Sequence, residues 1–224
     1  MKAKTIIIST AAVAAIGVTT HSCVALATSS IGVAIIKRVL LGGISKGLGI
    51  FKNKDAFLQN NLIDQAMPKS LREVNSILEK VAPNLVTKER EYIAQAASYT
   101  VNISEPILTN AVNSLTSEDV ARIAEGGQGM ATQVLKEKTS EQLIAAISPK
   151  VEEKLNQFGI VKSVNTALQG NALLGSLLGG NTTNLSSTGG ISRLASEQMV
   201  DGLFNIVEDY EKQNYQQIYQ ALGK

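Results

Sequence analysis

The sequence predicts an all-α protein, and three observations lead to that prediction. Apolar residues recur at helical spacing, most regularly between Leu143 and Phe158. Helix-capping patterns are frequent, and no stretch shows the apolar–polar alternation of a half-buried strand. Hydrophobic residues make up 44% of the chain but aromatic residues only 4%, which favours aliphatic packing between helices. We therefore expect a single multi-helix domain over residues 30–222.

The start of the chain has the pattern of a bacterial export signal. Lys2 and Lys4 precede the apolar run Thr5–Val18, which is too short to span a bilayer comfortably. We expect residues 1–22 to be a signal peptide of the lipoprotein type and the mature protein to be exported.

Two processing outcomes compete after this signal. Cys23, the only cysteine, follows a relaxed lipobox, whereas Ala25-Leu26-Ala27 fits cleavage by ordinary signal peptidase. We favour lipid attachment at Cys23, with residues 23–29 as a tether and the protein held at the periplasmic face of the outer membrane. The alternative is a soluble periplasmic protein cleaved after Ala27.

The first predicted helix covers residues 31–51. This stretch is apolar but carries three basic residues, which are too costly inside a bilayer, so it indicates an amphipathic helix. Small residues in it favour close approach by a second helix: Gly42, Gly43 and Gly47.

Prolines predict the boundaries of the next helices. A connector over 52–67 precedes Pro68, which we expect to open a helix that Pro83 ends. Thr87 is then expected to cap a long helix, and Pro106 is expected to kink or break it.

The stretch 116–159 carries the clearest helix boundaries. Thr116 and Thr139 each precede an acidic or amide residue by three positions, and only the second pattern is a strict capping box. Gly126-Gly127 favours a helix end between them, and Pro149 is expected to kink the last helix. We expect two or three helices here.

Three segments complete the predicted domain. A short helix is expected from 159 to about 169, and a helix from 191 to 222. Residues 170–190 are rich in Gly, Asn, Ser and Thr and predict a flexible loop, although four leucines at 173–178 could instead form a short helix on a partner or a membrane.

Little in the sequence indicates catalysis. The only histidine, His21, lies in the expected signal, which excludes Ser-His-Asp and Cys-His catalysis and histidine zinc sites from the mature chain. The G-x-S-x-G match at 43–47 has no predicted strand before it, and the Gly-Gly-Gln at 126–128 fits a helix end better than a site. We predict no catalytic residue, no metal and no cofactor.

The charge balance gives no reason to expect a nucleic-acid partner. Without Lys2 and Lys4 the chain has equal numbers of basic and acidic residues, 19 of each. A neutral protein lacks the electrostatic attraction on which nucleic-acid binding depends.

The C-terminal helix carries a group of acidic residues that forms the candidate functional surface. Neighbouring carboxylates can perform acid–base chemistry or hold a hard cation, although a solvated helix face is the commoner explanation. The group consists of Asp201, Glu208, Asp209 and Glu211.

Several short stretches match the pattern of one family. They are Asp55–Asn61, Pro68 with Leu71, Leu115–Thr132, Lys138–Leu143, Pro149, Asp201–Phe204, Glu208 and Glu211-Lys212. In these stretches the chain resembles the bacterial domain of unknown function 4197 family. The resemblance implies a largely helical, exported protein, and the family offers no established catalytic residues to carry over.

The sequence supports three hypotheses about function. The first is a non-enzymatic cell-envelope protein that binds a partner protein or an apolar ligand, with the membrane contacted through the N-terminal lipid. The second is a carboxylate- or metal-dependent periplasmic enzyme that uses the acidic group on the C-terminal helix. The third is a structural protein whose leucine-containing loop touches lipid.

Overall fold

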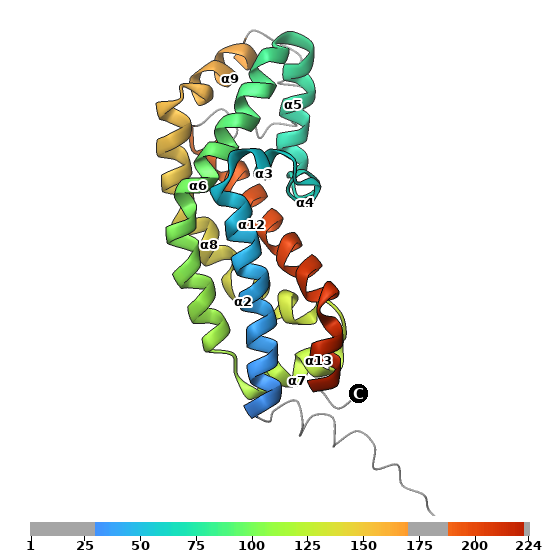
Figure 1. Ribbon diagram of the computed structural model, residues 1–224. Helices are drawn as coiled ribbons and strands as arrows, with labels where there is room; N and C mark the ends of the chain where they lie inside the picture. The colour runs from blue at the N-terminus through green and yellow to red at the C-terminus, as the bar shows by residue number, and fades with distance from the viewer. Residues whose placement is uncertain (1–29, 170–187, 222–224) are drawn as a thin grey trace, which may run out of the picture.

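The computed structural model describes residues 30–169 and 188–221, and the secondary structure in these ranges is helical throughout (Figure 1). The all-α prediction is confirmed. The elements are α2 (Ser30–Lys52), α3 (Lys54–Leu58), α4 (Asn61–Gln65), α5 (Lys69–Val81), α6 (Pro83–Asn113), α7 (Ser117–Gly126), α8 (Met130–Gln157), α9 (Ile160–Gln169), α12 (Thr188–Gln213) and α13 (Tyr215–Ala221). The expected signal, Cys23, the tether and residues 170–187 of the expected loop lie outside the described residues.

Four long helices form the body of the protein. α12 packs against α2 and α8, and α6 packs against the same two helices. Each helix runs opposite to the neighbours it packs on, so α2, α6, α8 and α12 form an up-down-up-down bundle (Figure 1). α7 and α13 lie at the end of the bundle where α2 begins, and α3, α4, α5 and α9 lie at the other end (Figure 1).

The core of the bundle is aliphatic, as the composition predicts. The regular apolar positions of α8, from Leu143 to Leu155, are at most 1% exposed. None of the helices in the described residues is both long enough and apolar enough to cross a membrane.

The expected close approach of a second helix to α2 is confirmed, and the second helix is α12. A Cβ added to Gly43 would lie 3.2 Å from the backbone of Val207, and one added to Gly47 would collide with the side chain of Leu203. Backbone atoms cannot turn aside as a flexible side chain can, so a side chain at position 43 would require the two helices to move apart by a few tenths of an ångström.

The helix boundary predicted at Pro83 is confirmed, but the cap predicted at Thr87 is wrong. α5 ends at Val81, and Pro83 occupies the first turn of α6, where its missing N–H costs nothing. Thr87 therefore lies inside α6 and does not cap it, and Pro106 is accommodated within the same continuous helix.

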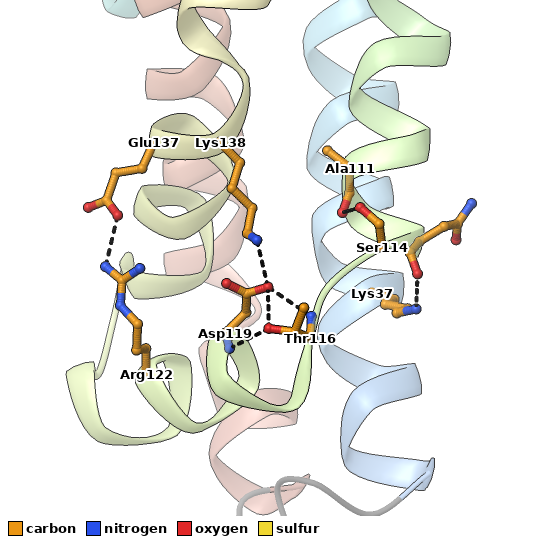
Figure 2. Close-up of polar contacts among 9 residues, drawn as sticks. Lys37, Ala111, Ser114, Thr116, Asp119, Arg122, Glu137 and Lys138 are labelled. Carbon is orange, nitrogen blue, oxygen red and sulfur yellow. Dashed lines mark hydrogen bonds and ion pairs between the residues drawn. The ribbon is translucent and has the colours of Figure 1, made fainter.

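The two predicted capping patterns have opposite outcomes. Thr116 forms a reciprocal capping box with Asp119: the Thr116 N–H donates to Asp119 Oδ2 at 2.8 Å, and the Asp119 N–H donates to Thr116 Oγ1 at 3.2 Å (Figure 2). Thr139 lies inside α8, where its hydroxyl donates to the Leu135 carbonyl at 2.8 Å, so the strict box predicted there is wrong. A threonine hydroxyl inside a helix can donate to a carbonyl of the preceding turn, so α8 continues past Thr139 without interruption.

Asp119 also connects α7 to α8. Lys138 Nζ lies 2.8 Å from its carboxylate, and Arg122 on α7 pairs with Glu137 on α8 at the same distance (Figure 2). Burial raises the pKa of Asp119, but the hydrogen bonds from Lys138 and Thr116 outweigh it and hold the pKa below its usual value.

The C-terminal helix differs from the prediction at both ends. α12 begins at Thr188, inside the range expected to be a loop, and ends at Gln213. α13 follows after Asn214, whose side-chain amide donates to the Tyr210 carbonyl at 2.9 Å and thereby satisfies an acceptor at the end of α12. The short helix expected near 159–169 is confirmed as α9.

Candidate functional site

Glu211, one of the four predicted acidic residues, is buried and caps another helix. Its side chain accepts hydrogen bonds from the N–H groups of Gly129, Ala131 and Thr132 at 3.0, 3.2 and 2.7 Å, and from the Thr132 hydroxyl at 2.6 Å. Only 1% of Glu211 is exposed. The expectation of a solvated face is therefore wrong for this residue, because α12 brings its carboxylate to the positive end of α8.

The glycines of residues 126–129 make this cap possible. Gly127 and Gly129 have φ angles of +80° and +85°, which other residues rarely adopt, and they lie between the end of α7 and the start of α8. Gly129 is the N-cap of α8 and has no side chain to bond the first N–H groups, so Glu211 supplies the acceptor. The interpretation of this segment as a helix boundary is confirmed.

The other three predicted residues lie on the surface of α12 and each pairs with a different lysine. Asp201 pairs with Lys136 on α8 at 2.9 Å, and its side chain is 44% exposed. Asp209 pairs with Lys46 on α2 at 3.4 Å, and Glu208 pairs with Lys212, with both acidic side chains 40% exposed. The structure does not bring the four acidic groups together.

A polar hollow of about 210 Å³ lies between the start of α8 and α12. Glu208 and Lys136 face it, but the N–H groups at the start of α8 already bind Glu211. This hollow is therefore a poor anion site, in spite of the helix end beside it. Across residues 30–169 and 188–221, no group of three or more His, Cys, Asp and Glu could hold a metal ion.

A second buried carboxyl, Glu89 on α6, was not singled out by the sequence analysis. Only 1% of Glu89 is exposed, and neither carboxyl oxygen has a hydrogen-bond partner. Burial raises its pKa from 4.5 to about 7, against the opposing effects of Asn75 and the positive charge of Arg90. A carboxyl with such a shift inside a protein is a candidate functional group.

Two buried amides share the environment of Glu89. The amide of Asn75 on α5 donates to the Met67 sulfur at 3.7 Å, and that of Gln198 on α12 donates to the Ile63 carbonyl at 3.3 Å. The carbonyl oxygens of both amides have no partner. We call Glu89, Asn75 and Gln198 the acceptor cluster, since in the described part of the chain their four oxygens are the only buried side-chain N or O atoms without a partner.

A small cavity adjoins the acceptor cluster. Its volume is about 10 Å³, which is room for one water-sized group. Asp64 lies in its wall, and both carboxylate oxygens of Asp64 accept from Arg90 Nη2, at 2.8 and 2.9 Å. The lining residues are Phe57, Leu58, Asp64, Met67, Glu89, Arg90, Ile93 and Gln198.

A larger groove of about 530 Å³ runs beside α5 and α6. Met67 and Arg90 line both the groove and the small cavity, so the two spaces adjoin. Most of the groove's surface is apolar, because long charged side chains contribute their aliphatic stems to its walls. The lining residues are Met67, Lys69, Arg72, Glu73, Asn75, Ser76, Glu79, Val86 and Arg90.

One signal in the sequence points to Glu89. Ile93, Ala97 and Val101 recur at helical spacing in this helix, and one step of four residues back along that apolar stripe reaches Glu89. A carboxyl on a buried stripe requires a partner or a raised pKa. The sequence does not show that Asn75 and Gln198 lie beside it, because these residues are on other helices.

Comparison with known proteins places the chain in a family. No curated protein and no solved structure matches it. A family model described as "Protein of unknown function (DUF4197)" matches residues 26–221, which covers most of the sequence and both sites described above. The chain therefore belongs to the DUF4197 family of proteins of unknown function.

Proposed function

We propose that this protein is a non-enzymatic binding module of the bacterial cell envelope, and that it holds a small amphipathic molecule in the groove beside α5 and α6. The main observation in support of this proposal is the groove itself. Its volume of about 530 Å³ lies within the range usual for small-molecule sites, its surface is mostly apolar, and it adjoins buried polar groups that lack partners. A molecule with an apolar body and a hydrogen-bonding head matches this combination.

Binding is better supported than catalysis. The carboxylates proposed for an enzyme are used in ion pairs with Lys46, Lys136 and Lys212 or, for Glu211, in the cap of α8. Asp64 and Arg90, which line the small cavity together with Glu89, bond each other. Acid–base catalysis requires a second group free to exchange a proton with the substrate, and these pairs do not supply one.

The groove can be tested with a neutral apolar probe. Ser76 is an exposed residue of the groove wall, so Ser76→Trp would fill the groove without disturbing the core. We expect the variant to bind N-phenyl-1-naphthylamine at least about tenfold more weakly than the wild type in a fluorescence titration.

Ser45→Trp is the matched control for this experiment. Ser45 is also an exposed serine on a helix, and it does not line the groove. Its affinity for the probe is expected to equal that of the wild type. Equal binding by Ser76→Trp and Ser45→Trp, or no binding by the wild type, would contradict the proposed function.

Location in the envelope is proposed from the N-terminal signal. We infer that Cys23 carries a diacylglyceryl group that anchors the protein at the periplasmic face of the outer membrane. Intact-mass and peptide mass spectrometry of protein expressed in a bacterial host should find the lipid on Cys23. An unmodified chain that starts at Thr28 would instead show cleavage after Ala27 and a soluble periplasmic protein.

A further inference from the structure

The acceptor cluster consists of four buried oxygens that have no hydrogen-bond partner. Glu89 contributes two of these oxygens, and Asn75 and Gln198 contribute one each. Buried acceptors without partners are costly, and each such group requires an explanation. Their positions on α5, α6 and α12 mean that three helices must pack together before the cluster exists.

We propose that the small cavity beside Glu89 binds a primary ammonium group, the head of the amphipathic molecule that the groove holds. This inference rests on the proposed function, and it adds the chemical class of the ligand. An ammonium group is about the size of a water molecule, and the cavity of about 10 Å³ holds one such group. Its three N–H donors match the unpartnered oxygens of the two cluster residues that line the cavity, two from Glu89 and one from Gln198.

The charges around the cavity favour a single positive charge. Asp64 and Arg90 form an ion pair that is neutral as a whole, so ionised Glu89 leaves a net charge of −1. One ammonium group neutralises that charge, whereas a divalent cation would leave an excess of +1 in a buried space.

The walls of the cavity also argue against a hard metal ion. Phe57, Leu58 and Ile93 present apolar side chains to it. Ca²⁺ takes about 6–8 oxygen ligands and Mg²⁺ retains several water molecules, and a space for one water-sized group provides neither arrangement. An ammonium group requires only three acceptors and directs its fourth bond to its own carbon chain.

The groove provides a path for that carbon chain. Met67 and Arg90 line both spaces, so a chain that leaves the cavity passes Met67 and enters the groove. A methionine side chain is flexible and apolar, and it can move aside for an alkyl chain and then pack against it. Arg90 is held by Asp64 and does not present a free positive charge to the ammonium group.

Isothermal titration calorimetry with n-octylammonium chloride tests the inference. Near pH 8, above the pKa of about 7 at which Glu89 ionises, we expect the wild type to bind n-octylammonium. Glu89→Gln keeps the shape of the side chain but removes its charge, and it is expected to bind at least about tenfold more weakly. 1-Octanol and n-octyltrimethylammonium should bind the wild type at least about tenfold more weakly, since the first lacks the charge and the second lacks N–H donors.

Glu105→Gln is the matched control, because Glu105 is an exposed glutamate of the same helix, α6, and lines neither the cavity nor the groove. Its affinity for n-octylammonium is expected to stay within about twofold of the wild type. Equal binding of n-octylammonium by Glu89→Gln and the wild type would overturn the ammonium site. A metal ion as occupant would also overturn it. In that case calcium chloride or sodium chloride would raise the melting temperature of the wild type but not that of Glu89→Gln.

The same titrations separate this inference from the proposed function. If 1-octanol binds the wild type as tightly as n-octylammonium and Ser76→Trp abolishes both, the groove function stands and the ammonium site is wrong. If none of the octyl compounds binds the wild type, both proposals are wrong.

Discussion

Replacement of Glu211 by glutamine is expected to lower the free energy of unfolding by about 2–4 kcal/mol, although the substitution preserves the shape of the side chain. The carboxylate accepts three backbone N–H bonds and one hydroxyl bond at the start of α8. Glutamine has a single oxygen, so its NH₂ group would face N–H donors and leave them unsatisfied in a buried site. In a chain of this size the melting temperature should fall by roughly 10 °C.

Glu208→Gln is the matched control for this measurement. Glu208 lies on the same helix and pairs with Lys212 at the surface, with 40% of its side chain exposed. Its loss is expected to change stability by less than about 1 kcal/mol. Both variants can be compared with the wild type by urea denaturation followed by circular dichroism, and a similar small effect for both would show that the cap contributes little.

Glu89→Gln is expected to stabilise the protein at neutral and higher pH. The folded protein holds a proton on Glu89 up to about pH 7, whereas the unfolded chain releases it near 4.5. Between these values the unfolded state binds fewer protons than the folded state, so stability falls as pH rises, and the loss is complete above about pH 7. The loss amounts to as much as about 3 kcal/mol, which the glutamine variant does not incur.

The test is the difference in unfolding free energy between Glu89→Gln and the wild type, measured by urea denaturation at several pH values. The difference should be near zero around pH 4.5 and should reach its maximum above about pH 7. Other titrating groups contribute equally to both proteins and cancel. Glu79→Gln, which removes an exposed carboxylate, should show no such rise, and a difference that does not vary with pH would contradict the buried state of Glu89.

The helical fold was predictable because its signals are local. The apolar stripe from Leu143 to Leu155 lies within one helix, and its spacing alone indicates which face is buried. Gly127 and Gly129 mark a helix boundary because their backbone angles are open mainly to glycine. The glycines of α2 likewise predicted a close helix contact, although they did not show that α12 is the partner.

Errors arose where two local signals compete. Thr139 matches the strict capping pattern better than Thr116, yet only Thr116 caps a helix. Both threonines can form the required bond, and the packing of the apolar face of α8 on both sides of Thr139 decides that this helix continues. At the boundary predicted for Pro83 the next helix begins at the proline itself, so Thr87, the predicted cap, lies inside α6.

The two carboxyls with the clearest roles show what the sequence by itself determined and what only the tertiary structure decided. The sequence determined that Glu211 belongs to a C-terminal helix and that Glu89 continues an apolar stripe, because both properties depend on near neighbours. Only the tertiary structure decided that Glu211 caps the helix whose N-cap, Gly129, lies 82 residues earlier, and that Glu89 lies buried near the amides of Asn75 and Gln198. Contacts between helices depend on how the helices pack against each other, and the spacing of residues along one helix does not specify that packing.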